Sequence, residues 1–146
     1  MFGIENSKDR LLQLKNNFEL LKQDELNISL AEQTCSDAWH LIDWVYEEKK
    51  QSDITLTKEQ FRKTVYEQCQ EMKIHHDLVN SFKHKNLSRQ KVKIIETRVH
   101  GGAISSGFSK GFDVSRLEVH FEDKSKIDVD DLVEIAINYW NKVILE

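Results

Sequence analysis

Apolar and charged residues in the first part of the chain recur with the period of an α-helix. Residues 5–24 place apolar side chains at intervals of three and four, with charge on the other face, which predicts an amphipathic helix. The apolar positions are Leu11, Leu14, Phe18 and Leu21, with Leu12 and Leu20 flanking them. A second helix is predicted from about Asn27 to Glu48, because Ser29 and Glu32 have the spacing of a capping box.

The second predicted helix has a charged face that includes an aromatic residue. One broad arc is apolar and is expected to face the core. The opposite arc carries Asp37, His40, Asp43 and Glu47, and Trp44 lies among them. Because aromatic residues are enriched in the centres of protein interfaces, Trp44 is the natural anchor for a second copy or another partner.

Two shorter helices are predicted after a polar connection at residues 49–56. Thr57 and Gln60 again have capping-box spacing and mark the start of a third helix. Its apolar side consists of Phe61, Val65, Cys69 and Met72. The apolar positions then rotate to another side, which predicts a break near Lys73 and a fourth helix that ends by Lys85.

From Lys91 the chain becomes rich in β-branched residues, which favours strands. We expect strands at about 92–99, 116–122 and 127–129, the last two forming an antiparallel hairpin. A Gly- and Ser-rich loop, residues 101–113, joins the first two. In the second strand, one face carries Leu117, Val119 and Phe121, and the other carries Arg116, Glu118, His120 and Glu122.

The expected fold class is α+β, mostly helical. Asp130 is the predicted N-cap of a final helix so apolar that it must pack on two sides. The chain then reads as an N-terminal bundle of about four helices (5–88), a small antiparallel β-meander (91–129) and a packed C-terminal helix (130–146). We find no internal repeat and no linker, and a chain of 146 residues has the size of one domain, so 1–146 is predicted to be a single domain.

Composition narrows the class of protein. Proline is absent, and no apolar stretch is long enough for a signal peptide or a membrane span. We therefore expect a cytoplasmic protein without a membrane partner. Cys35 and Cys69 are the two cysteines, too few for a disulfide framework. Both fall on predicted core faces, where a thiol acts as a small apolar group and not as a nucleophile.

Charge is unevenly distributed along the chain. Residues 73–116 contain nine Lys or Arg and three acidic residues, a net charge of +6, although the whole chain has a net charge of −4. This segment also contains four of the six histidines. An anionic partner is one interpretation, and mutual neutralisation of basic and acidic segments in the fold is the other. The residues expected to contact an anionic substrate are Lys83, Lys85, Arg89 and Lys110.

The segment at residues 74–84 carries the clearest candidate chemistry. On a helix, His76, Asn80 and His84 stand at i, i+4 and i+8, with Asp77 and Lys83 beside them. Such a row of imidazole and amide groups can bind a phosphate, exchange protons near neutral pH, or hold a carboxylate of a neighbouring helix. The alternative is an ordinary solvated face.

This row resembles the site of the HEPN superfamily of small helical bundles. In that family an Arg, then a polar residue, then a His four to six residues from the Arg form a metal-independent ribonuclease site, often in toxin or antiphage defence systems. The resemblance covers residues 5–88 and puts His76 in the place of the Arg, Asp77 in that of the polar residue and His84 in that of the His. In this chain seven residues separate the two histidines.

The residue types also suggest a metal site and a phosphate-binding loop. Asp37 and His40, one helical turn apart, could join His76 and His84 around a metal ion, but no established metal motif is present, and we expect no metal and no cofactor. Loop 101–113 has the glycine spacing of a phosphate-binding loop, but Phe108 stands where that motif requires lysine. The aromatic residues of the loop either clasp a partner or nucleobase, or fold back onto the sheet.

Two functions follow as hypotheses. The first is an RNA-binding protein or metal-independent ribonuclease of a toxin or antiphage defence system. Its candidate catalytic residues are His76, Asp77, Asn80, His84 and His40. The second is a non-enzymatic interaction module, a homodimer or the binder of a cognate protein, that uses Trp44. No motif for sequence-specific DNA recognition is present. Whether the chain is an enzyme stays open at this point.

Overall fold

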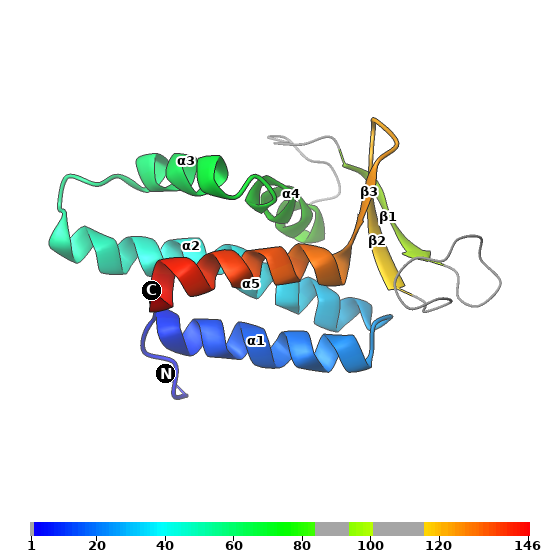
Figure 1. Cartoon of the computed structure of the whole chain (residues 1–146), viewed down its shortest axis with the longest axis horizontal. Helices are drawn as coiled ribbons and strands as arrows, with labels where there is room; N and C mark the ends of the chain where they lie inside the picture. Colours follow the sequence, from blue (N-terminus) through cyan, green and yellow to red (C-terminus); the bar gives the residue numbers. More distant parts are fainter. Residues whose placement is uncertain (1, 84–93, 101–115) are drawn as a thin grey trace.

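The computed structural model describes residues 2–83, 94–100 and 116–146, and it confirms an α+β fold that is mostly helical. The elements in chain order are α1 (Ser7–Gln23), α2 (Ile28–Ser52), α3 (Lys58–Gln68), α4 (Met72–Lys83), β1 (Ile94–His100), β2 (Arg116–Phe121), β3 (Lys126–Asp128) and α5 (Val129–Leu145). In Figure 1, α1, α2 and α5 form a bundle, α3 and α4 lie along its opposite side from α1, and the sheet stands at one end. Within the described ranges no helix is both long and apolar enough to cross a membrane.

Helix α2 forms the centre of the core. It contacts α1, α3, α4 and α5, and it buries ten of its residues. The indole of Trp140 on α5 is fully buried, and its Nε1 donates a hydrogen bond to the backbone carbonyl of Ala38 at 2.9 Å. Because a buried N–H needs a partner, this hydrogen bond fixes the position of α5 against α2. The last helix was expected to pack on two sides, and this is one of its contacts.

The helix starts follow capping chemistry. The predicted capping box of Thr57 and Gln60 is present at the start of α3, with both reciprocal hydrogen bonds formed. The box predicted for Ser29 and Glu32 is wrong. Instead Asn27 is the N-cap of α2, and its side chain accepts a hydrogen bond from the third backbone N–H of the helix.

Three element boundaries differ from the prediction. Helix α2 continues to Ser52 and not to Glu48, because no glycine or proline stops it in the residues that follow. The break between α3 and α4 is present, but it occupies residues 69–71, just before the predicted position. The final helix begins at Val129 directly after β3, so its N-cap is Asp128 and not Asp130.

The charged arc of α2 that includes Trp44 is partly covered by α1. Asp37 is only 8% exposed, and its carboxylate accepts hydrogen bonds from Asn17 Nδ2 on α1 (2.7 Å) and Gln33 Nε2 (2.8 Å). Trp44 is half-buried, with the Arg10 guanidinium carbon 4.8 Å from its ring centroid. Helix α1 packs at these two positions, so the charged arc is only partly solvated.

The strands form an antiparallel sheet in the order β1-β2-β3, as expected for a meander. Val119 of β2 is fully buried, in agreement with its predicted apolar face. The predicted polar face is not uniformly solvated, since Glu118 is only 3% exposed. Its carboxylate is paired with Lys126 Nζ at 3.0 Å and His120 Nε2 at 3.1 Å, which offsets the cost of burying the charge.

Both cysteines are buried, as predicted, and both are free thiols. Burial raises the pKa of Cys35 to about 12 and that of Cys69 to about 11. Each side chain is therefore a protonated thiol near neutral pH, which agrees with a role in packing and not in nucleophilic catalysis.

One histidine fastens α4 to α5. His75 is fully buried, and its Nε2 donates a hydrogen bond to the Leu132 carbonyl at 3.2 Å. The Cys35 carbonyl also faces the ring, without closing a hydrogen bond to Nδ1. Burial lowers the pKa of His75 to about 4, against the smaller opposite effect of the two carbonyls, so the folded protein holds a neutral imidazole.

We predict that His75 makes the protein less stable as the pH falls. In the unfolded chain the histidine titrates near 6.5 and in the folded protein at about 4, so only the unfolded state takes up the proton between these values. The free energy of unfolding should decrease by about 3 kcal/mol from this residue as pH falls through that window.

The measurement is urea unfolding of the wild type and His75→Gln at several pH values between about 7 and 4.5. Glutamine keeps a neutral donor but cannot titrate, so its free energy of unfolding should fall less steeply with pH. Equal pH dependence in the two proteins would show that His75 does not carry the effect.

Candidate functional site

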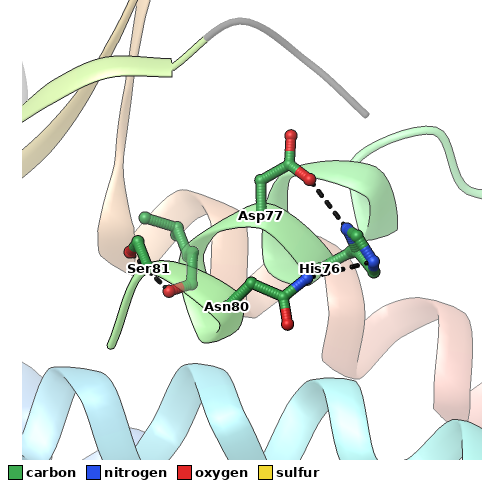
Figure 2. A network of polar contacts seen from close by, with 5 residues as sticks. His76, Asp77, Asn80 and Ser81 are labelled. Atoms are coloured by element: carbon green, nitrogen blue, oxygen red, sulfur yellow. Dashed lines mark hydrogen bonds and ion pairs between the residues drawn. The ribbon is translucent and has the colours of Figure 1, made fainter. Parts of the chain in front are cut away.

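A connected set of polar side chains lies on α4, at part of the row that the sequence singled out. His76 Nδ1 and Asp77 Oδ1 are 2.7 Å apart, and Asn80 Nδ2 and His76 Nε2 are 3.2 Å apart. Figure 2 shows Asp77 and Asn80 each joined by a dashed line to a different nitrogen of the His76 ring. The side chain of His76 is 15% exposed and that of Asp77 only 1%.

These two hydrogen bonds define the state of the imidazole. An ionised carboxylate can only accept, so the pair with Asp77 puts a proton on Nδ1 of His76. The neutral ring then has a lone pair on Nε2, which accepts from the amide of Asn80. A carboxylate on Nδ1 fixes the tautomer and the orientation of the ring, and this is the arrangement that orients a histidine as a general base.

Aromatic contacts from two other helices hold His76 in place. The ring of Trp39 on α2 meets His76 edge to face, with centroids 5.1 Å apart. Tyr66 on α3 stacks on Trp39 at 6.1 Å, and the Arg62 guanidinium carbon lies 5.6 Å from a Trp39 ring centroid. Since α2, α3 and α4 all contribute, the position of the imidazole is fixed by tertiary packing and not by α4 alone.

His76 lies in the wall of a surface groove of about 750 Å³ along α3 and α4. The lining residues are Glu59, Arg62, Lys63, Tyr66, Glu67, Gln70, Lys73 and His76. Three cations face two carboxylates there, which leaves a net positive charge before the histidine is counted. Burial raises the pKa of Tyr66 to about 12, so its phenol stays protonated and can donate a hydrogen bond near neutral pH.

One acidic residue at the edge of the groove reduces the positive charge that is available to bind an anion. Asp43 on α2 lies 2.9 Å from Lys58 Nζ and 3.8 Å from an Arg62 guanidinium nitrogen. The longer distance leaves Arg62 only loosely paired, and its side chain is 40% exposed. Arg62 can therefore turn toward an anion in the groove at little cost.

The predicted site residues are only partly brought together. His76, Asp77 and Asn80 are in contact, whereas His40 is exposed on α2 and does not line the groove. Lys83 ends α4, and its side chain lies outside the described part of the chain. The predictions for His84, Lys85, Arg89 and Lys110, and for loop 101–113, also fall outside the described residues.

Sequence reasoning missed the cationic and aromatic wall that α3 contributes. Arg62 and Tyr66 are one helical turn apart and so lie on the same side of α3. This spacing was visible in the sequence, but it shows nothing of the partner helix. Only the break at residues 69–71 brings Lys73 and His76 against the same groove.

The alternative metal site does not assemble among the residues that the structure describes. Asp37 accepts hydrogen bonds from Asn17 and Gln33, and it forms no three-residue cluster with His40 and His76. In these ranges the one group of three candidate ligands is Asp128, Asp130 and Asp131, whose ligand atoms lie within 4.8 Å of one another. Acidic clusters near a surface are common without an ion, so this group carries no assignment.

Comparison of the chain with protein-family models, with curated proteins and with solved structures finds no match.

Proposed function

We propose that the groove along α3 and α4 binds single-stranded RNA and cleaves it without a metal ion. The observation that carries the proposal is the His76 imidazole, held by Asp77 in the wall of a groove with a positive balance of charge. A base beside cations is what phosphodiester cleavage requires, because a proton must leave the nucleophile while negative charge grows on the phosphate.

RNA supplies its own nucleophile for this reaction. His76 Nε2 would take the proton from a 2′-hydroxyl, whose oxygen attacks the adjacent phosphorus. The bond from phosphorus to the 5′-oxygen then breaks, leaving a 2′,3′-cyclic phosphate and a 5′-hydroxyl that takes a proton from water. Arg62 and Lys73 line the same groove and would stabilise the charge on the phosphate oxygens.

The same chemistry selects RNA over DNA and single strands over duplexes. DNA has no 2′-hydroxyl, so the reaction cannot begin on it. The in-line attack also needs a flexible backbone, and unpaired nucleotides can stack on an aromatic side chain such as Tyr66. In the structure the amide of Asn80 is hydrogen-bonded to His76 Nε2. The 2′-hydroxyl would replace Asn80 in this hydrogen bond when RNA binds.

The resemblance to the HEPN superfamily supports the same activity and extends it to a biological role. His76 and Asp77 take the first two positions of that family's site. We therefore propose a cytoplasmic role in a toxin or antiphage defence system, which the buried free thiols support. A ribonuclease of this kind is kept harmless by a neutralising partner.

A second candidate function, partner binding through Trp44, has less support. An anchor residue must be open to insert into its partner. Trp44 is half-buried, and Arg10 lies over its ring at 4.8 Å. Its aromatic face is thus already used within the fold.

We predict that His76→Ala strongly lowers the rate of metal-independent cleavage. Loss of a positioned general base lowers a rate about 10²–10⁴-fold. The measurement is cleavage of labelled single-stranded RNA in the presence of a chelator, with the double variant His76→Ala/His84→Ala as a second comparison. His120→Ala, a change of the same kind on the sheet, should keep wild-type activity.

Asp77→Asn tests the orienting carboxylate in the same assay. It should slow cleavage while leaving RNA binding close to that of the wild type, because it changes the tautomer and orientation of His76 and not the cations. Intact RNA with the folded wild-type protein would refute the cleavage activity. Equal activity of wild type and His76→Ala would refute the role of His76.

We also predict that Arg62 and Lys73 set the salt dependence of RNA binding. Each phosphate contact that is removed should weaken binding and reduce the slope of log K against log salt by about 1. Binding of an uncleavable 2′-deoxy oligonucleotide, measured at several salt concentrations, separates this effect from catalysis. Lys142→Gln on α5 is the matched control, and an unchanged slope for Arg62→Gln and Lys73→Gln would contradict the assignment.

A further inference from the structure

The outer face of α1 carries two leucines that point away from the core. Leu12 is 59% exposed and Leu20 is 54% exposed, whereas Leu11 and Leu21 on the same helix are 1% and 2% exposed. The sequence had placed Leu12 and Leu20 at the flanks of the buried stripe. The structure puts them on the opposite side, because α1 contacts α2 and α5 with its other face.

Together with three polar residues these leucines form a regular row, which we call the α1 ridge. Its members are Lys8, Leu12, Asn16, Leu20 and Asp24, spaced four residues apart, and all five are exposed. At 100° per residue Asn16 lies opposite the middle of the buried face. Rows of this spacing are the ridges by which helices most often pack against each other.

The order of side chains along the α1 ridge is self-complementary when it is reversed. From either end it reads charge, leucine, amide, leucine, charge, with a cation at one end and a carboxylate at the other. A second ridge running in the opposite direction would bring leucine against leucine and Lys8 against an aspartate. A parallel arrangement would instead oppose equal charges.

We propose that the α1 ridge is the contact surface between two copies of this chain, which pack α1 against α1 in antiparallel directions across a twofold axis. Leu12 contacts Leu20 of the partner subunit, and Lys8 pairs with Asp24 of the partner subunit. Asn16 meets Asn16 of the partner subunit on the axis, where a paired amide fixes the register. The Asp24 carboxylate accepts one hydrogen bond, from Asn27 Nδ2 at 3.0 Å, and has further lone pairs for the lysine.

This surface is independent of the proposed ribonuclease site. In Figure 1, α1 lies on one side of the bundle, and α3 and α4, which line the groove, lie on the other. Substitutions on the α1 ridge should therefore change the mass in solution without changing the groove. If the dimer is not found, the proposed ribonuclease activity is unaffected, and the reverse also holds.

The first test measures mass by light scattering and analytical ultracentrifugation from micromolar to submillimolar protein. The wild type is expected to reach twice the mass of one chain, and Leu12→Glu/Leu20→Glu is expected to stay at the mass of one chain at every concentration. Far-UV circular dichroism shows that the variant is folded, which is expected because both side chains are exposed. A wild type that stays monomeric, or a folded double variant that still dimerises, would overturn the proposal.

A charge-exchange experiment tests the antiparallel pairing itself. In Lys8→Glu two acidic residues oppose each other twice, and in Asp24→Lys two lysines do so, so each variant alone should lose the dimer. Mixed in equal amounts, the two variants restore both ion pairs and should form a heterodimer of twice the chain mass. Both substitutions suit their ends of α1, since glutamate favours a helix N-terminus and lysine a C-terminus.

Lys142→Glu, the same reversal on α5, is the control and should dimerise like the wild type. A mixture that shows no heterodimer, while both single variants are monomeric and folded, would overturn the antiparallel pairing. A dimer that persists in each single variant would equally exclude the ion pairs as its determinant.

Discussion

Every other helix in the described part of the chain packs against α2, and this constraint decides which side chains α2 can carry. A helix surrounded on several sides has little solvated face, so its polar groups need partners inside the protein. Thr34 is fully buried, and its hydroxyl donates to the Leu30 carbonyl at 2.6 Å. Asp37 is satisfied by the two amides of Asn17 and Gln33. Side-chain hydrogen bonds thus satisfy the polar groups of α2 that water cannot reach.

The same packing gives two adjacent histidines opposite environments. One residue along a helix is a rotation of 100°, so His75 points into the contact with α5 while His76 faces the groove. Burial keeps His75 neutral and fastens α4 through the Leu132 carbonyl. His76 is instead bonded at both nitrogens by side chains of its own helix. The buried histidine thereby positions the element that carries the accessible one.

Local signals made most of the fold predictable. The helical periodicity, the cap at Thr57 and the contact of His76 with Asn80 all involve residues three or four apart, which a sequence displays directly. The pairing of Asn17 with Asp37 could not be predicted, because it joins two helices whose relative rotation depends on the whole core. The buried charge of Glu118 was missed for the same reason, since one of its partners, Lys126, belongs to another strand.

The separation of groove and α1 ridge has a consequence for binding. Two copies joined through α1 would carry their grooves on the outer sides of the assembly, because α1 and the α3–α4 pair flank the bundle on opposite sides. Each groove would then act on its own stretch of polymer without completing the other. A long RNA that reaches both would be held more tightly than a short one, since the second contact forms at a high effective concentration. The gain in affinity would depend on RNA length and on dimerisation, whereas the rate of cleavage at a single groove would depend on neither.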